Sequence, residues 1–247
     1  MKLFKNKKAV ISVVASMFLI AFLSAKTNHE NKPQDIEILS YIVDPKKQNI
    51  KFFWKDEAGE NYGNFLSLKK EIEAKGGKLI FATNGGMYDE KHQPNGLYIE
   101  NGLLVTPINQ IQKGYGNFYL LPNGVFYLEK NGRASITPTT DLKELKHISY
   151  ATQSGPMLVI GGKIHSQFKK GSKHKNIRNG VGILPDGKIL FAMSKEKVNF
   201  YDFASYFKKK ACKNALYLDG FVSKTYLPLK NWEQTDGDLG VIIGIVE

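Results

Sequence analysis

The sequence predicts an α+β protein: a single domain of many hairpin-connected strands in a mixed, largely antiparallel sheet core, with two main helices. Short apolar runs alternate with Asn-Gly, Gly-Gly and Asp-Gly pairs, which are typical of hairpin turns. Two longer segments place their apolar residues at helical spacing instead. No low-complexity linker interrupts the chain after residue 35, so its 247 residues favour one core.

The first predicted elements are two strands, a helix and a third strand. The runs "IEILSYIV" (36–43) and "IKFFW" (50–54) predict strands on either side of a turn at Asp44-Pro45. The segment "FLSLKKEIEAKGG" (65–77) has apolar residues three and four apart and ends in two glycines, which favours a helix. The run "KLIFATNGG" (78–86) predicts a buried strand that ends in a polar turn.

Five hairpins are expected next, each from a glycine-containing pair between apolar runs. They are "ENGL" (100–103), "LPNGV" (121–125), "EKNGR" (129–133), "MLVIGGKI" (157–164) and "GILPDGKILFAM" (182–193).

The last predicted elements are a helix and two strands. The segment "NFYDFASYFKKKAC" (199–212) carries an apolar face, with Asn199 as its N-cap. Cys212, the single cysteine, excludes an internal disulfide and is expected to pack at the helix end, with a catalytic thiol as the alternative. The runs "ALYL" (215–218) and "LGVIIGIV" (239–246) predict strands.

The N-terminus predicts export. Four lysines precede an uncharged apolar run over residues 9–23, which is short for a membrane span and typical of a signal peptide. We therefore expect a signal peptide or N-terminal anchor over 1–25, a polar spacer over 26–35 and a globular domain over 36–247. The protein would be periplasmic, secreted or tethered on the outer side of the membrane. Membrane contact would occur only through residues 9–23, if they are not cleaved.

The chain is basic, with a net charge of +12 that falls to +8 without residues 1–25. Such a surface suits nucleic acid, an anionic envelope or an acidic substrate, and export makes nucleic acid the least favoured. We therefore expect no nucleic-acid partner. Only two of the 35 basic residues are arginines, Arg133 and Arg178.

Four polar, glycine-containing segments follow or flank buried strands: "TNGGMYDE" (83–90), "ATQSGPM" (151–157), "KHKNIRNGVG" (173–182) and "LDGFVSK" (218–224). Glycine allows backbone N–H groups to approach a ligand, and amide and hydroxyl side chains can orient it. Each segment alone is compatible with an ordinary turn, including Asp219-Gly220. Together they predict a shared site.

Several familiar motifs are missing. The sequence contains no GxGxxG, GxxxxGK[ST], HExxH or GxSxG motif and no paired cysteines. A zinc enzyme and a nucleotide-dependent enzyme are therefore disfavoured, and we expect no cofactor and no metal ligands. A calcium ion held by carboxylates and carbonyls stays open as an alternative.

The order of four motifs resembles the phosphodiester glycosidase family, which includes the animal mannose-6-phosphate uncovering enzyme and bacterial relatives. The motifs are Asn-Gly-Gly-Met-Tyr, Gln-Ser-Gly-Pro-Met-Leu-Val, Ile-Arg-Asn-Gly-Val-Gly and Leu-Asp-Gly, and the resemblance covers roughly residues 78–246. It implies hydrolysis of the bond between a sugar's anomeric carbon and a phosphodiester oxygen.

The resemblance also implies which residues form the site. Its implied catalytic residues are Asp219 and Arg178. The expected substrate-binding residues are Asn84, Gly85, Gln153, Ser154, Gly155, Asn179, Gly220 and Ser223. The sequence departs from the family's Asp-Gly-Gly-Gly-Ser-Ser run at Phe221, Val222 and Lys224. These departures imply a changed or narrower substrate site.

The residues suit this chemistry for a physical reason. Most glycosidases use two carboxyl groups, one of which protonates a poor leaving group. A phosphomonoester leaves readily, so one carboxylate and one cation could suffice, and the planar fork of an arginine suits phosphate. Asp89, Asp236 and Asp238 are possible second carboxylates.

The predicted function is hydrolysis of a small-molecule or polymeric sugar-1-phosphodiester by an exported glycosidase. Two alternatives stay open: a binding protein for an anionic glycan that does not cleave it, and a phosphodiesterase that cleaves P–O. The second would be expected to need metal ions.

Overall fold

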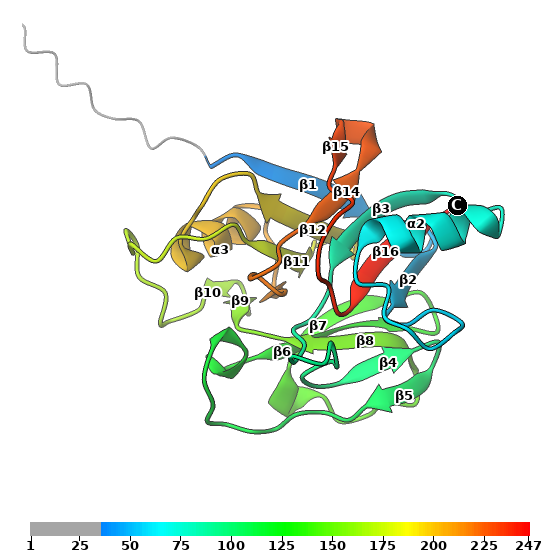
Figure 1. The fold of residues 1–247 in the computed structure, drawn as a ribbon. Coiled ribbons are helices and arrows are strands. Elements are labelled where there is room, and N and C mark those ends of the chain that lie inside the picture. The colour runs from blue at the N-terminus through cyan, green and yellow to red at the C-terminus, as the bar shows by residue number, and fades with distance from the viewer. Residues whose placement is uncertain (1–35) are drawn as a thin grey trace, which may run out of the picture. The chain divides into compact units, whose positions relative to one another are not determined.

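The computed structural model describes residues 36–247, which form three sheets and two α-helices (Figure 1). Every strand pairing among these residues is antiparallel. The α+β class and the two main helices are confirmed. The prediction of one mixed core sheet is wrong, because the strands divide among three sheets. The predictions for residues 1–35 lie outside the described residues.

The first sheet has six strands in the order β1-β12-β11-β13-β9-β10. Their bounds are β1 Ile38–Val43, β12 Ile189–Ser194, β11 Asn179–Ile183, β13 Ala215–Tyr217, β9 Met157–Ile160 and β10 Lys163–Ile164. The predicted Gly-Gly hairpin joins β9 to β10, with φ of 55° at Gly161 and 79° at Gly162. The Asp-Gly hairpin joins β11 to β12.

The second sheet has five strands in the order β15-β14-β3-β16-β2. Their bounds are β15 Trp232–Glu233, β14 Thr225–Leu227, β3 Leu79–Asn84, β16 Ile242–Val246 and β2 Ile50–Phe53. The first two predicted strands therefore do not pair with each other, because β1 joins β12 and β2 joins β16. The turn at Asp44-Pro45 leads the chain from one sheet into another.

The third sheet has five strands in the order β5-β4-β8-β6-β7. Their bounds are β5 Leu103–Thr106, β4 Tyr98–Glu100, β8 Ile148–Ser154, β6 Gly124–Glu129 and β7 Ala134–Pro138. Asn-Gly turns join β4 to β5 and β6 to β7, as predicted. The pair Asn101 and Gly102 has φ of 51° and 80°, which is the left-handed backbone that a tight hairpin requires.

The expected hairpin at 121–125 is wrong. Gly124 begins β6, and a Cβ atom there would overlap the sulfur of Met157, so the glycine permits close packing instead of a turn. Asn123 is buried, and its side-chain amide donates to the carbonyl of Phe118. Asn123 and Gly124 therefore lie where the chain enters β6. An Asn-Gly pair that is needed for close packing cannot be distinguished, from the sequence alone, from one that forms a turn.

Both predicted helices form with asparagine N-caps. Helix α2 spans Phe65–Ala74 and α3 spans Phe200–Lys209. Asn64 accepts from the N–H of Ser67, and Asn199 accepts from the N–H of Asp202. Their apolar faces are buried against the sheets, as the helical spacing predicts. Short 3-10 helices lie at η1 Asn117–Tyr119, η2 Thr139–Asp141 and η3 Pro228–Lys230.

The largest core cluster joins all three sheets. The ring of Phe126 in β6 lies 5.6 Å from Phe52 in β2 and 5.9 Å from Phe191 in β12, measured between ring centroids. Cys212 is also buried and packs in a second cluster with α3, so its predicted position at the helix end is confirmed. Within residues 36–247, neither α-helix has the length and apolarity needed to span a bilayer.

Candidate functional site

The ends of β3, β11 and β13 meet around the side chain of Asn84. The Asn84 amide donates to the carbonyl of Asp219 at 2.6 Å. Its Oδ1 accepts from the amide of Asn179 at 2.9 Å and from the backbone N–H of Lys224 at 2.9 Å. Because Asn84 ends a strand of the second sheet and Asn179 begins a strand of the first, these bonds join the two sheets at the predicted site.

Gly85 continues this junction through its backbone. Its carbonyl accepts from the N–H of Asp219 at 3.0 Å, and its own N–H donates to the carbonyl of Val241 at 2.7 Å. A Cβ atom at Gly85 would lie 2.7 Å from Cγ1 of Val241. The glycine is therefore required for the approach of the backbone to Val241.

The carboxyl group of Asp219 is buried where β13 has ended. Asp219 is 8% exposed, and its Oδ1 accepts from the backbone N–H of Phe221 at 3.0 Å. Among the described residues, no basic side chain forms an ion pair with it. Burial raises the pKa of Asp219 to about 6, although the bond from Phe221 acts in the opposite direction.

Arg178 is also buried, with only 2% of its surface exposed. Its Nε donates to the carbonyl of Val198 at 2.9 Å, and its Nη2 donates to the carbonyl of His174 at 3.3 Å. Its Nη1 donates to the hydroxyl of Tyr217 at 3.2 Å. The guanidinium lies 3.6 Å from the ring centroid of Phe200, at the start of α3.

The guanidinium of Arg178 has no carboxylate partner within residues 36–247. Burial lowers its pKa, but arginine stays charged in proteins. Of its five N–H donors, three are used by the groups above, so two have no protein partner among the described residues. A buried, uncompensated cation of this kind is costly and points to a functional role.

Tyr217 contacts Arg178, precedes Asp219 by two residues, and was missed by the sequence prediction. Its hydroxyl accepts from Arg178, and a Cβ atom at Gly220 would overlap the same hydroxyl. Residue 220 must therefore be glycine. Burial raises the pKa of Tyr217 to about 12, so the phenol keeps its proton. Side chains two residues apart in an extended segment lie on the same face. The spacing of Tyr217 and Asp219 could therefore have identified Tyr217 as a site residue from the sequence.

The hydroxyl of Ser223 lies within hydrogen-bonding distance of three groups and so stabilises the loop that follows Asp219. Its hydroxyl lies 3.3 Å from the carbonyl of Ile177, 3.3 Å from Oδ1 of Asn179 and 3.4 Å from the carbonyl of Gly220. A single hydroxyl proton can serve one of these acceptors at a time. The structure thus brings together Asn84, Gly85, Arg178, Asn179, Asp219, Gly220 and Ser223.

Gln153 was predicted to bind substrate, but protein groups occupy its amide. Its Oε1 accepts from the N–H groups of Leu97 and Asn109, each at 2.9 Å. Its Nε2 donates to the carbonyl of Asn109 and to the hydroxyl of Thr139. All four hydrogen-bonding positions of the amide are filled, so in this structure Gln153 binds three separate parts of the chain, at Leu97, Asn109 and Thr139, and has no amide position left for a substrate.

Ser154 and Gly155 lie at the end of β8. The Ser154 hydroxyl is fully buried and has no hydrogen-bond partner among the residues that the structure describes. Gly155 packs against Asn123, where a Cβ atom would lie 2.7 Å from the Asn123 Cβ. The segment reaches the site through its backbone, because the carbonyl of Pro156 accepts from the N–H of Tyr217.

The departures from the family run have distinct environments. Phe221 is completely exposed, whereas Val222 packs against the cluster beneath α2. The Lys224 ammonium pairs with Asp236 at 2.7 Å.

Two of the three possible second carboxylates already have protein partners. Asp236 pairs with Lys224, and Asp89 accepts from the N–H groups of Lys91 and Gln93 in its own turn. Neither Asp236 nor Asp89 therefore offers a carboxylate free of protein partners.

The third possible second carboxylate, Asp238, lies beside another aromatic residue of the site. Nε2 of His92 lies 2.6 Å from Oδ1 of Asp238, and the Tyr88 hydroxyl donates to the Asp238 carbonyl. The rings of Tyr88 and His92 stack at 5.2 Å. Burial first, and then the charges of Asp219 and Asp238, raise the pKa of Tyr88.

Other chemistries find less support in residues 36–247. Burial raises the pKa of the Cys212 thiol to about 11, which keeps it protonated at neutral pH, so it is unsuited to be a nucleophile. No group of three or more His, Cys, Asp or Glu side chains in this part of the chain could hold a metal ion.

The buried carboxyl group of Asp219 and the buried guanidinium of Arg178, which donates to the Tyr217 hydroxyl, lie among the segments gathered around Asn84 and suit hydrolysis of a phosphorylated substrate. Comparison with known sequences agrees with this class. The phosphodiester glycosidase family matches residues 77–245, and the chain belongs to that family. The resemblance inferred from the four motifs is confirmed.

One protein of similar sequence and two solved structures of similar fold can be compared with this chain. YigE, an uncharacterised protein of Escherichia coli, is 39% identical over 193 residues, which are 78% of this chain and 75% of YigE. The catalytic domain of zebrafish N-acetylglucosamine-1-phosphodiester alpha-N-acetylglucosaminidase is 18% identical with a TM-score of 0.55, covering 88% of this chain and 85% of that domain. A hypothetical Synechocystis protein is 12% identical with a TM-score of 0.57, covering 85% and 59% of the two chains.

Proposed function

We propose that this protein is an exported hydrolase that cleaves the glycosidic C–O bond of a sugar-1-phosphodiester. The observation that carries the proposal is the placement of two buried groups at the same end of the paired strands β11 and β13: the carboxyl of Asp219, whose charge adds to burial in raising the pKa of Tyr217, and the guanidinium of Arg178, which donates to the Tyr217 hydroxyl. Family membership supports the same reaction class. The substrate would be a small-molecule or polymeric sugar phosphodiester.

In this reaction water adds across the bond between the anomeric carbon and the phosphodiester oxygen. The products are a free sugar, which keeps the new hydroxyl, and a phosphomonoester, which keeps the original bridging oxygen. The leaving group is stable as an anion, so a second carboxyl acting as general acid is less necessary than in most glycosidases. One ionised Asp219 would act on the anomeric carbon or on the attacking water.

Tyr217 and Arg178 would stabilise the departing phosphate. The Tyr217 hydroxyl accepts from Arg178, which leaves its own proton free to donate to a phosphate oxygen. The two remaining N–H groups of Arg178 would provide further donors and positive charge. Donors that are already oriented in a buried site stabilise developing charge better than water does.

Incubation with a panel of sugar-1-phosphodiesters tests the proposed reaction directly. The purified protein is incubated with sugar-1-phosphodiesters in ¹⁸O-labelled water, and the products are identified by mass spectrometry. We expect free sugar carrying the label at its anomeric hydroxyl, together with an unlabelled phosphomonoester. Sugar-1-phosphate with labelled phosphate would instead establish P–O cleavage and overturn the proposal.

A second candidate function has one observation in its favour. Phe221 replaces a glycine of the family run and exposes its whole side chain beside Asp219. A fully exposed aromatic ring suits stacking on a sugar, as in a glycan-binding protein. Saturable binding of the panel compounds without any product would favour this non-catalytic function over hydrolysis.

Export is proposed from the N-terminal pattern alone. If residues 1–25 act as a signal peptide, cell fractionation should place the protein outside the cytoplasm, and sequencing should find a mature N-terminus near residue 26. An intact N-terminus in the membrane fraction would indicate an anchor. A cytoplasmic protein that begins at Met1 would contradict export.

A further inference from the structure

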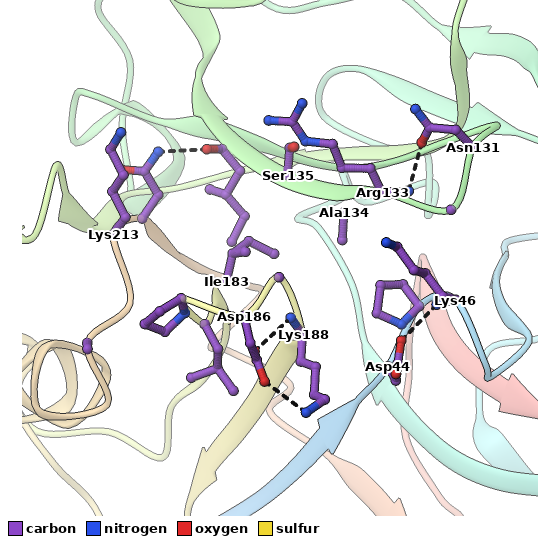
Figure 2. A pocket seen from close by; sticks show the side chains of 18 residues that line it. Asp44, Lys46, Asn131, Arg133, Ala134, Ser135, Ile183, Asp186, Lys188 and Lys213 are labelled. Carbon is purple, nitrogen blue, oxygen red and sulfur yellow. Dashed lines mark hydrogen bonds and ion pairs between the residues drawn. The ribbon is translucent and has the colours of Figure 1, made fainter.

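A cavity of about 1100 Å³ lies away from the Asp219 site (Figure 2). The turn after β1, the β6–β7 hairpin, the β11–β12 hairpin and the segment after α3 line it. Ile183 is in this lining, four residues beyond Asn179 along β11, which corresponds to about 14 Å at the rise of an antiparallel strand. The cavity is therefore separate from the site described above.

The lining of this cavity is basic. Four basic side chains face two acidic ones: Lys46, Arg133, Lys188 and Lys213 against Asp44 and Asp186. Lys188 is paired with Asp186 at 2.8 Å, so these two charges offset each other. Asp44 is engaged by the backbone N–H of Lys46 at 3.0 Å and lies 4.0 Å from the Lys47 ammonium.

Two cations in the lining form no ion pair with another described residue, and a third forms only a long one. Within residues 36–247, the ammonium groups of Lys46 and Lys213 form no ion pair, and Arg133 is 3.9 Å from its nearest acidic partner, Glu129. The hydroxyl of Ser135 lies in the same lining and has no hydrogen-bond partner in the described part of the chain. These groups are available to an anionic ligand.

The cations are spread around the cavity. They belong to three separate segments of the chain, and Figure 2 shows Lys213 and Lys46 on opposite sides of the cavity with Arg133 between them. Cations on opposite sides of a cavity suit an extended ligand with negative groups at intervals better than a single compact anion. A cavity of this volume has room for several units of such a ligand.

We propose that this cavity binds a polyanionic chain, one that carries phosphate or carboxylate groups at intervals. The proposal does not depend on the activity of the Asp219 site. The test uses the full-length protein at about 0.15 M salt, where long-range attraction between exposed charges is largely screened. Its probes are inorganic polyphosphate, polygalacturonate, neutral dextran and inorganic phosphate, and binding is measured by titration calorimetry.

Two triple variants with equal net charge make the test specific. The cavity variant carries Lys46→Gln, Arg133→Gln and Lys213→Gln, and the control carries Lys70→Gln, Lys113→Gln and Lys143→Gln at exposed positions elsewhere. We expect the cavity variant to bind polyanion about tenfold more weakly, the combined effect of three exposed charge contacts. The control should change by less than about threefold, because it loses only non-specific attraction.

Each outcome decides the proposal. A preference for polyphosphate or for polygalacturonate identifies the anionic group. Equal losses in the two variants would mean diffuse attraction to a basic surface and would overturn the proposal, as would the absence of polyanion binding. If inorganic phosphate binds as tightly as polyphosphate, the proposal that the ligand is an extended chain is overturned. The single variant Lys213→Glu, with a melting curve for each protein, guards against a loss caused by unfolding.

Discussion

An Asp219→Asn variant is expected to lose turnover by about a thousandfold or more while its fold becomes more stable at neutral pH. The substitution keeps the shape of the side chain and an Oδ1 that can accept from the N–H of Phe221. It removes the charge that the proposed reaction requires at the anomeric carbon. Substrate binding should survive, because Arg178 and Tyr217 are unchanged.

The gain in stability follows from the raised pKa of Asp219. Its pKa is about 6 in the folded protein and has the ordinary value of 3.8 when unfolded. Between these pH values the folded protein holds a proton that the unfolded chain has released, so the free energy of unfolding falls as the pH rises. At neutral pH the buried charge destabilises the fold by roughly 1–3 kcal/mol, which asparagine removes.

The measurements are kcat/KM and the free energy of unfolding across pH. In the parent protein kcat/KM should rise as the pH passes through about 6, because Asp219 must be ionised. The stability gain of Asp219→Asn should vanish below about pH 3.8. The matched control is Asp56→Asn, because Asp56 accepts from the N–H two residues on in an exposed turn. If Asp219→Asn keeps most of its turnover, Asp219 has no catalytic role and only shapes a turn.

An Arg178→Lys variant is expected to lose about a hundredfold of kcat/KM and about 2–4 kcal/mol of unfolding free energy. Lysine keeps the charge but cannot reach Val198, Tyr217 and His174 together, as the planar guanidinium does. It also loses the stacked contact with Phe200. Acceptors that stay buried without a donor account for most of the lost stability.

Loss of folding must be separated from loss of chemistry in this variant. Chemical denaturation measures the first, and assays well below the melting temperature isolate the second. Lys210→Ala is the control, since it removes a surface cation held 5.8 Å from the ring of Tyr206. Tyr217→Phe removes only the hydroxyl that accepts from Arg178 and should lower turnover with a smaller loss of stability. Normal turnover in folded Arg178→Lys would exclude a role for the guanidinium fork.

The local elements could be predicted because their signals are local. Phe65, Leu68 and Ile72 recur at helical spacing, and all three are buried in α2. Asn-Gly is one of the few residue pairs that readily adopt the left-handed backbone of a tight turn, so Asn101-Gly102 indicates the hairpin of β4 and β5. The motifs around Asn84, Arg178 and Asp219 were also visible, because each is a polar, glycine-containing segment beside an apolar strand.

Tertiary structure alone decided which strands pair and what each polar group contacts. The register of Ile38 with Ser194 and of Ile242 with Phe53 joins segments far apart in the chain, so no local pattern encodes the division into three sheets. Gln153 lies in a polar, glycine-containing segment of the kind that binds ligands. Its amide is nevertheless fully hydrogen-bonded to protein groups within residues 97–139, far from it in the sequence. The raised pKa of Asp219 likewise arises from burial, which depends on the packing of the whole chain around one carboxyl group.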